Sequence, residues 1–202
     1  NSVLSVSTGS NPIYAGGGAT GGALTTRTVL GQPIGQFFGY EVTGIFQNED
    51  DVTKSPQAGT AKPGDFIYRD LNNDGVISGQ YRVVMGNPNP KWVYGLNTTF
   101  NYKDFDLTVD FQGVAGVSVY NANLGLRYGN ENYTKDFYDN RWNGQGTSNT
   151  YPSANIGGNQ NYLPNSFFVE SGSYFRVRNL QLGYTFPVAK IERAHLKQLR
   201  IF

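Results

Sequence analysis

Two consecutive stretches of the chain alternate apolar and polar residues with a period of two. Within residues 92–102 the even positions are mostly aromatic or aliphatic, whereas the odd positions are small or polar. After residues 103–104 the alternation resumes over residues 105–112 in the opposite phase. Because successive side chains of a strand point to opposite faces, the pattern predicts a tight β-hairpin with one apolar and one polar face.

Further strands are predicted on either side of this hairpin. Residues 36–46 (QFFGYEVTGIF) and 174–186 (YFRVRNLQLGYTF) also alternate, residues 24–29 favour a strand, and residues 199–202 begin one. Upstream of Asn179 the phase inverts, which predicts a β-bulge or an exit from a membrane. Helical periodicity is nearly absent and turn residues recur throughout, so the chain is predicted to be all-β.

The connections between these strands differ greatly in length. Those at residues 47–90 and 121–171 are long and polar, whereas those at 103–104 and 187–198 are short. Outer-membrane barrels combine short periplasmic turns with long extracellular loops. The sequence therefore predicts part of a large antiparallel transmembrane β-barrel. The alternative is a soluble secreted β-sandwich that binds carbohydrate, with the apolar face as its core and a cation-stabilised loop.

In the barrel, one face of each strand meets lipid and the other a watery lumen. Trp92 and Tyr94 would mark one aromatic girdle, and Phe100 with Tyr102 the other. The residues expected to face lipid are Trp92, Tyr94, Leu96, Phe100, Tyr102, Leu107, Val109, Phe111, Leu182 and Tyr184. Those expected to line the lumen are Asn97, Thr99, Asn101, Thr108, Asp110 and Gln181.

Composition narrows the classes of protein. Charged residues make up 15% of the 202 residues, against about 25% in typical soluble domains. The net charge of +1 gives no basic patch, so no nucleic-acid partner is expected. The sequence contains no run of about 18 apolar residues, so no transmembrane helix is predicted. The absence of cysteine fits both envelope and cytosolic proteins, and the start at Asn1, with no visible signal peptide, leads us to expect a fragment.

Five ordered segments resemble the SusC/RagA family of TonB-dependent outer-membrane transporters of Bacteroidetes-type bacteria. They cover nearly the whole chain after Val29. The segments are GQPIGQFFGYEVTGIFQ (31–47), AKPGDFIYRDLNNDGVI (61–77), RVVMGNPNPKWVYGLNTTFNYKDFDL (82–107), RWNGQGTS (141–148) and YFRVRNLQLGYTFP (174–187).

This resemblance implies a fold, a location and partners. Residues 1–202 would be a fragment of a barrel domain of about 22 strands, lacking the N-terminal plug and the final strands. The protein would lie in the bacterial outer membrane and import oligosaccharides or other glycans, or oligopeptides. A SusD-like surface lipoprotein would close over the barrel, and the TonB complex would act through the missing N-terminal part. No enzymatic activity is implied.

One polar segment matches the first half of a calcium-binding loop. Asp70, Asn72 and Asp74 stand at the spacing of oxygen ligands, and Val76 would add its carbonyl. Tyr81 stands where the motif has a bidentate acid, and where the resembling family commonly has aspartate. The segment is therefore either an Asx-type turn or a weak site for structural calcium or another cation, and no other cofactor is expected.

Aromatic residues of the second long connection are candidates for contact with substrate. Trp142, Tyr128, Tyr133 and Tyr138 could stack on sugar faces, or else pack the loop against itself or against the lipoprotein. The carboxylates of this region lie in no catalytic motif, and His195 is the sole histidine. No catalytic residues are therefore expected.

Overall fold

The chain forms two compact units. The computed structural model describes all residues except 8, 10, 18–21, 125–131 and 155–159. One unit comprises Asn1–Asn89 and Ser118–Ser171, and the other comprises Pro90–Val117 and Gly172–Phe202. The second unit contains the two-faced hairpin.

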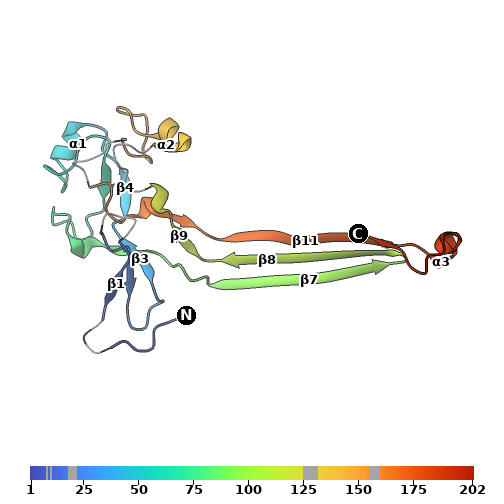
Figure 1. Cartoon of the computed structure of the whole chain (residues 1–202). Coiled ribbons are helices and arrows are strands. Elements are labelled where there is room, and N and C mark those ends of the chain that lie inside the picture. Colours follow the sequence, from blue (N-terminus) through green and yellow to red (C-terminus); the bar gives the residue numbers. More distant parts are fainter. Residues whose placement is uncertain (8, 10, 18–21, 125–131, 155–159) are drawn as a thin grey trace. The chain divides into compact units, whose positions relative to one another are not determined.

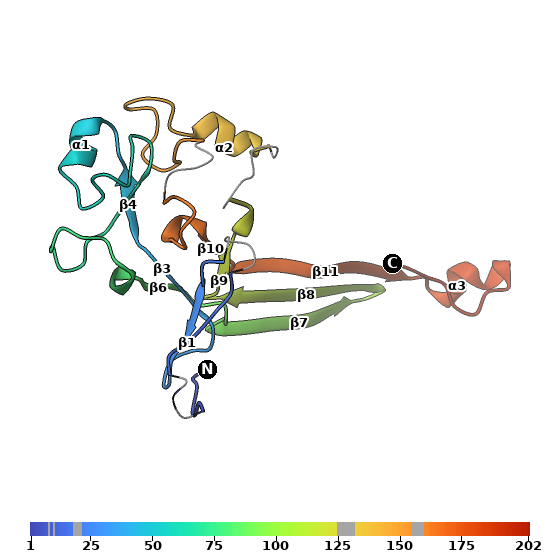
Figure 2. The same ribbon diagram turned by 60° about the vertical axis from the view of Figure 1, so that its left-hand side comes forward.

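Long antiparallel strands build this second unit (Figures 1 and 2). The order in the sheet is β12 (Arg200–Ile201), β11 (Tyr174–Thr185), β8 (Phe105–Ala115) and β7 (Trp92–Tyr102). The turn between β7 and β8 places Lys103 at φ 53°, in the left-handed region that tight turns use. The hairpin predicted from the alternation is confirmed.

The connection from β11 to β12 is short. It holds α3 (Val188–Ile191) and the 3-10 turn η5 (Glu192–Ala194). In the described part of the chain, no helix has the length and apolar character needed to cross a membrane.

The register of the long strands puts their apolar residues in rows. Leu96 lies opposite Phe111 across β7 and β8, and Leu107 lies opposite both Phe100 and Leu182. Leu96, Phe100 and Leu182 are 60%, 61% and 61% exposed. A sandwich would bury such a face under a second sheet, and the described residues of this unit form one sheet only, so this unit by itself is not a β-sandwich.

A β-bulge explains the inverted phase in β11. The pairing of β11 with β8 shifts register between Val177 and Asn179, so Arg178 is the extra residue. Val177 then lies opposite Phe111, and Phe175 lies opposite Gly113. Both side chains thereby join the apolar face of the strand, which confirms the bulge.

The first unit contains several short sheets. Its four-stranded sheet has the order β1 (Ile13–Ala15), β2 (Thr26–Thr28), β3 (Gln36–Gly39) and β6 (Val83–Gly86). Two further antiparallel pairs are formed by β4 (Val42–Ile45) with β5 (Phe66–Tyr68), and by β9 (Ser118–Tyr120) with β10 (Val169–Ser171).

The prediction of one strand over residues 36–46 is wrong, because β3 and β4 belong to different sheets. At the break, the backbone of Tyr40 donates to the carbonyl of Pro164 over 2.8 Å and accepts from the amide of Ser166 over 3.0 Å. A Cβ at Gly39 would lie 2.1 Å from the Pro164 oxygen. The backbone of Tyr40 therefore pairs with Pro164 and Ser166, which are distant in sequence, at the point where β3 would have continued.

Both long connections contain regular structure. Residues 47–90 hold α1 (Glu49–Thr53) and the 3-10 turn η2 (Gly79–Tyr81), besides β5 and β6. Residues 121–171 hold α2 (Lys135–Asn140), the 3-10 turns η3 (Ala122–Leu124) and η4 (Ser166–Phe168), and β10. Asn48 caps α1 by accepting from the amide of Asp51 over 2.9 Å.

Aromatic and aliphatic side chains of β4 and β5 form the core of the first unit. Ile45, Phe66 and Tyr68 are each at most 3% exposed. Tyr40, Val42, Ile77, Trp142, Leu163 and Phe167 pack against them. Both long connections contribute to this cluster, so they fold together.

Buried side-chain amides form hydrogen bonds with backbone groups that the short strands leave unpaired. The side chain of Gln57, which is 3% exposed, donates to the Phe66 carbonyl over 2.9 Å and accepts from the Tyr68 amide over 2.8 Å. Asn165, which is fully buried, donates to the carbonyl of Leu163 over 2.8 Å. Each amide supplies the hydrogen bonds that a neighbouring strand would otherwise provide.

We expect Gln57→Leu to loosen β5. The substitution leaves two buried backbone groups without partners, which costs about 2 kcal/mol or more. In hydrogen exchange of the full-length protein, the amide of Tyr68 should exchange at least about tenfold faster. The exposed Gln80→Leu is the matched control, and unchanged exchange at Tyr68 in Gln57→Leu would contradict the role assigned to this side chain.

Candidate functional site

Aromatic rings gather at one end of the apolar face of the long strands. The Phe175 ring stacks on that of Phe111, with centroids 5.5 Å apart and planes at 12°, and lies 6.3 Å from the ring of Tyr94. The Tyr94 ring covers Gly113, where a Cβ would lie 2.5 Å from it. Trp92, which is 72% exposed, completes this end.

A second aromatic group lies at the opposite end. Tyr102 pairs with Phe105 across the hairpin. The ring of Tyr184 lies 4.7 Å from that of Phe105 and 4.8 Å from that of Phe186. Between the two groups the face is largely aliphatic, as in the apolar band and girdles of a membrane barrel.

The length of the strands suits a bilayer. β7 and β8 each have 11 residues. At about 3.4 Å per residue and a tilt of about 40°, such a strand crosses roughly 27 Å, close to the apolar band of about 25 Å in outer-membrane barrels.

Hydrogen-bonded charges lie on the opposite face. The guanidinium of Arg200 donates to both carboxylate oxygens of Asp106, over 3.2 and 2.6 Å. Arg178, the bulge residue, lies 3.9 Å from the carboxylate of Asp110, and the hydroxyls of Thr99 and Thr108 are 3.1 Å apart. Sequence reasoning placed Asp110 and the threonines on this face but missed the Asp106–Arg200 pair.

This geometry defines a class of protein. Among the described residues of this unit, one face offers hydrocarbon side chains that no second sheet covers, and the other offers paired charges and amides suited to water. Strands of this kind form the wall of a membrane-spanning β-barrel, where lipid and lumen lie on opposite sides.

Comparison with known proteins narrows the class. No family model matches the chain. The TonB-dependent receptor P26 of Formosa agariphila is 30% identical over 183 residues, and the TonB-dependent receptor P3 of the same bacterium is 32% identical over 177 residues. These alignments cover 90% and 85% of this chain but only 18% and 17% of the relatives.

Solved structures show the same fold. The RagAB peptide transporter matches 98% of the chain with a TM-score of 0.68 and 17% identity. The RagAB peptide importer in its closed-closed state matches 94% with a TM-score of 0.61. The chain spans 20% of each of these matched chains.

The chain is thus similar in sequence to one stretch of TonB-dependent receptors and shares the fold of the matched RagAB chains, in agreement with the resemblance to the SusC/RagA family. The predictions of an all-β barrel segment and of a bacterial outer-membrane location are thereby confirmed.

The Asp70 segment is a closed network of hydrogen bonds. The carboxylate of Asp70 accepts from the amides of Asn73 and Gly75, both over 2.9 Å. The Tyr81 hydroxyl donates to the Asp74 carboxylate and lies 2.9 Å from Oδ1 of Asn72. The hydrogen bond from Tyr81 lowers the pKa of Asp74, and the same bond raises the pKa of Tyr81.

Tyr81 thus occupies the position where a calcium loop has its bidentate acid, and it contacts two of the candidate ligands. Val76 donates its amide to Asp74 over 3.0 Å, as an Asx-type turn requires. Among the residues that the structure describes, no three His, Cys, Asp or Glu side chains are grouped to hold a metal. Cation binding by Asp70, Asn72, Asp74 and Val76 stays a prediction.

Trp142 is part of the core cluster. Its indole N–H donates to Oε1 of Gln47 over 3.3 Å. Its ring also lies over Gly64, where a Cβ would be 2.6 Å from it. Gly64 has φ +90°, so both its backbone and the ring exclude a side chain. These contacts support the packing alternative for Trp142.

The tyrosine candidates differ in exposure. The ring of Tyr133 stacks on Phe137, with centroids 4.3 Å apart. Tyr138 is 62% exposed, and the guanidinium of Arg141 lies 4.0 Å from the centre of its ring. Tyr128 lies outside the described residues. Substrate contact by these residues and by Trp142 stays a prediction, and Tyr138 has the most accessible ring of those described.

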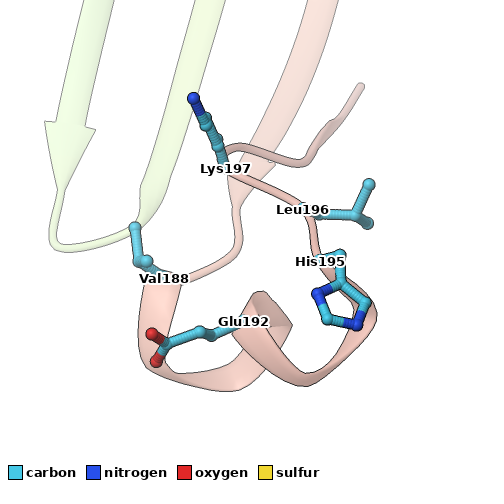
Figure 3. A pocket seen from close by; sticks show the side chains of 5 residues that line it. All are labelled: Val188, Glu192, His195, Leu196 and Lys197. Atoms are coloured by element: carbon cyan, nitrogen blue, oxygen red, sulfur yellow. The ribbon is translucent and has the colours of Figure 1, made fainter.

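Figure 3 shows an open pocket in the connection from β11 to β12. It has a volume of about 450 Å³. Its lining residues are Val188, Glu192, His195, Leu196 and Lys197. One acid, one base and one imidazole without further ligands give it no recognisable catalytic or metal-binding arrangement.

We expect Tyr81→Asp to convert the Asp70 segment into a calcium site. The substitution removes the hydroxyl that engages Asp74 and Asn72 and supplies the missing carboxylate. Calorimetric titration of the full-length protein should show calcium affinity at least about tenfold above that of the parent protein. Gln80→Asp adds the same charge one residue away as a control, and equal affinity in the two variants would contradict this explanation.

Proposed function

We propose that the complete receptor imports large nutrients, mainly oligosaccharides and alternatively oligopeptides, across the outer membrane. In this proposal the TonB complex supplies the energy through a part of the protein outside this sequence, and a SusD-like lipoprotein closes over the barrel. The observation that carries the proposal is the apolar face shared by β7, β8 and β11, which is exposed along β7 and β11, beside a charged and polar opposite face.

The two faces assign this chain a part of the barrel wall. Lipid tails would cover the apolar face in place of a protein core. Contact with hydrocarbon removes these side chains from water and so makes their exposure on the barrel surface favourable. The paired charges of Asp106 with Arg200, and of Asp110 with Arg178, would border the path of the nutrient.

The long connections would lie on the extracellular side. Their shared core around Ile45, Phe66 and Tyr68 makes them a folded body rather than free loops. Such a body offers a defined surface to a lipoprotein and to a substrate, as extracellular loops of large barrels do. The placement of residues 47–90 and 121–171 outside the cell is part of this proposal.

The relatives support transport rather than catalysis. The curated relatives are named receptors, and the solved structures are described as a peptide importer or transporter. Movement through a barrel breaks no covalent bond, so the proposal needs no catalytic residues.

Uptake by living cells tests the proposal. Deleting the receptor should abolish uptake of a fluorescent oligosaccharide or oligopeptide mixture, and a protonophore should abolish it in the parent strain. A lipoprotein should also co-purify with the tagged receptor from outer membranes. Unchanged uptake of both mixtures in the deletion strain would overturn the proposal.

A matched pair of substitutions tests the assignment of the two faces. Leu96→Arg places a charge in the middle of the apolar face and should destabilise the barrel by about 2–4 kcal/mol. Asn97→Arg places the same charge on the polar face and should cost about 1 kcal/mol or less. The measurement is the amount of heat-modifiable folded receptor in outer membranes, and equal loss from both variants would contradict the assignment.

A further inference from the structure

The connection from β11 to β12 carries an excess of positive charge. Within residues 187–198, the cationic side chains are Lys190, Arg193 and Lys197, and Glu192 is the acidic one. All four residues are exposed. The ion pairs in the described part of the chain involve other residues. Because the net charge of the whole chain is only +1, this excess is a local property of the connection.

This connection begins where the second aromatic group ends. The ring of Phe186, which directly precedes residue 187, lies 4.8 Å from that of Tyr184. The amide of Phe186 donates to the carbonyl of Leu199 over 2.9 Å, so the chain returns to the same level. Figures 1 and 2 show α3 beyond the end of the long strands. Since aromatic girdles mark the level of the lipid headgroups, residues 187–198 lie beside them in a membrane barrel.

Exposed apolar side chains accompany the charges. Val188 and Leu196 are 59% and 43% exposed. Both line the open pocket of about 450 Å³, together with Glu192, His195 and Lys197 (Figure 3). Segments that combine exposed apolar side chains with cationic ones are typical of the boundary between lipid and water.

The direction of Lys197 matches this position. Figure 3 shows its side chain extending toward the long strands, away from the carboxylate of Glu192. Lysine side chains at a membrane surface lay their carbon chain along apolar groups and keep the ammonium among the headgroups. A lysine ammonium is a compact point charge that binds phosphate. Lys197 is therefore presented to lipid phosphate groups.

We propose that the connection from β11 to β12 binds the headgroup of an anionic glycerophospholipid. The phosphate lies against Lys197, Lys190 and Arg193 add to the attraction, and the glycerol end of the acyl chains lies on Val188 and Leu196. Each cationic side chain near an anionic membrane surface strengthens binding about fivefold. A zwitterionic headgroup carries its own cation and gains less from the same charges. The proposal rests on the proposed function, which places the strands in a membrane.

A local fluorescence measurement tests this site. The full-length receptor, labelled with a fluorophore at Gln198→Cys, is reconstituted in phosphatidylcholine vesicles. A small fraction of the lipid is spin-labelled phosphatidylglycerol or, in parallel, spin-labelled phosphatidylcholine, each of which quenches the fluorophore only at close range. Quenching should show phosphatidylglycerol enriched at least about tenfold over phosphatidylcholine beside the label, and high salt should reduce this preference.

Paired substitutions locate the source of the preference. Lys190→Gln with Lys197→Gln should reduce the enrichment at least about tenfold, since two charges are lost. Lys190→Arg with Lys197→Arg keeps both charges and should preserve it. Lys54→Gln with Lys62→Gln removes two exposed lysines of the other unit and should also preserve it. Heat-modifiability of each variant verifies that the barrel is folded.

Three results would overturn the proposal. They are equal quenching by the two spin-labelled lipids, an unchanged preference in the folded glutamine variant of Lys190 and Lys197, and loss of the preference when inorganic phosphate is added at matched ionic strength. The third result would identify a soluble anion as the occupant. Lipid contact is measured without transport, so its failure differs from unchanged uptake in the deletion strain.

Discussion

A strand that crosses a membrane must pair its backbone and still offer hydrocarbon to the lipid. No water is present in the bilayer core to satisfy N–H and C=O groups, so neighbouring strands must do so. β8 meets this requirement by pairing with β7 along its full length and with β11 on its other side. The same register brings Leu96, Phe111 and Val177 into one row, so backbone pairing and the apolar face arise together.

The first unit satisfies its backbone N–H and C=O groups in a different way. Its strands are only three or four residues long, and side-chain amides take over where pairing stops. Gln57 binds two backbone groups along one edge of β5, and Asn165 binds the carbonyl of Leu163. Gln47 joins the Trp142 indole to the backbone of Ser148. Long polar connections can therefore fold without a large apolar core.

Sequence reasoning succeeded where the determining contacts are local. The period-two pattern and a two-residue turn sufficed to predict β7, β8 and their faces, because such a turn fixes the register. It failed where distant residues decide the outcome. Pro164 ends β3 at Gly39, Arg200 pairs with Asp106 over 94 positions, and Gln47 engages Trp142 over 95. No local pattern marks such partners, although the acid at Asp106 shares the parity of Asp110.

The extra residue in β11 affects how related barrel strands can be compared. Removing Arg178 alone would leave Val177 opposite Phe111 and Asn179 opposite Asp110, so β11 and β8 would pair without interruption and Phe175 and Val177 would stay on the apolar face. A related strand that lacks this one residue can therefore keep both faces, and an alignment that does not allow for the skipped position would wrongly judge the orientation of the side chains before it.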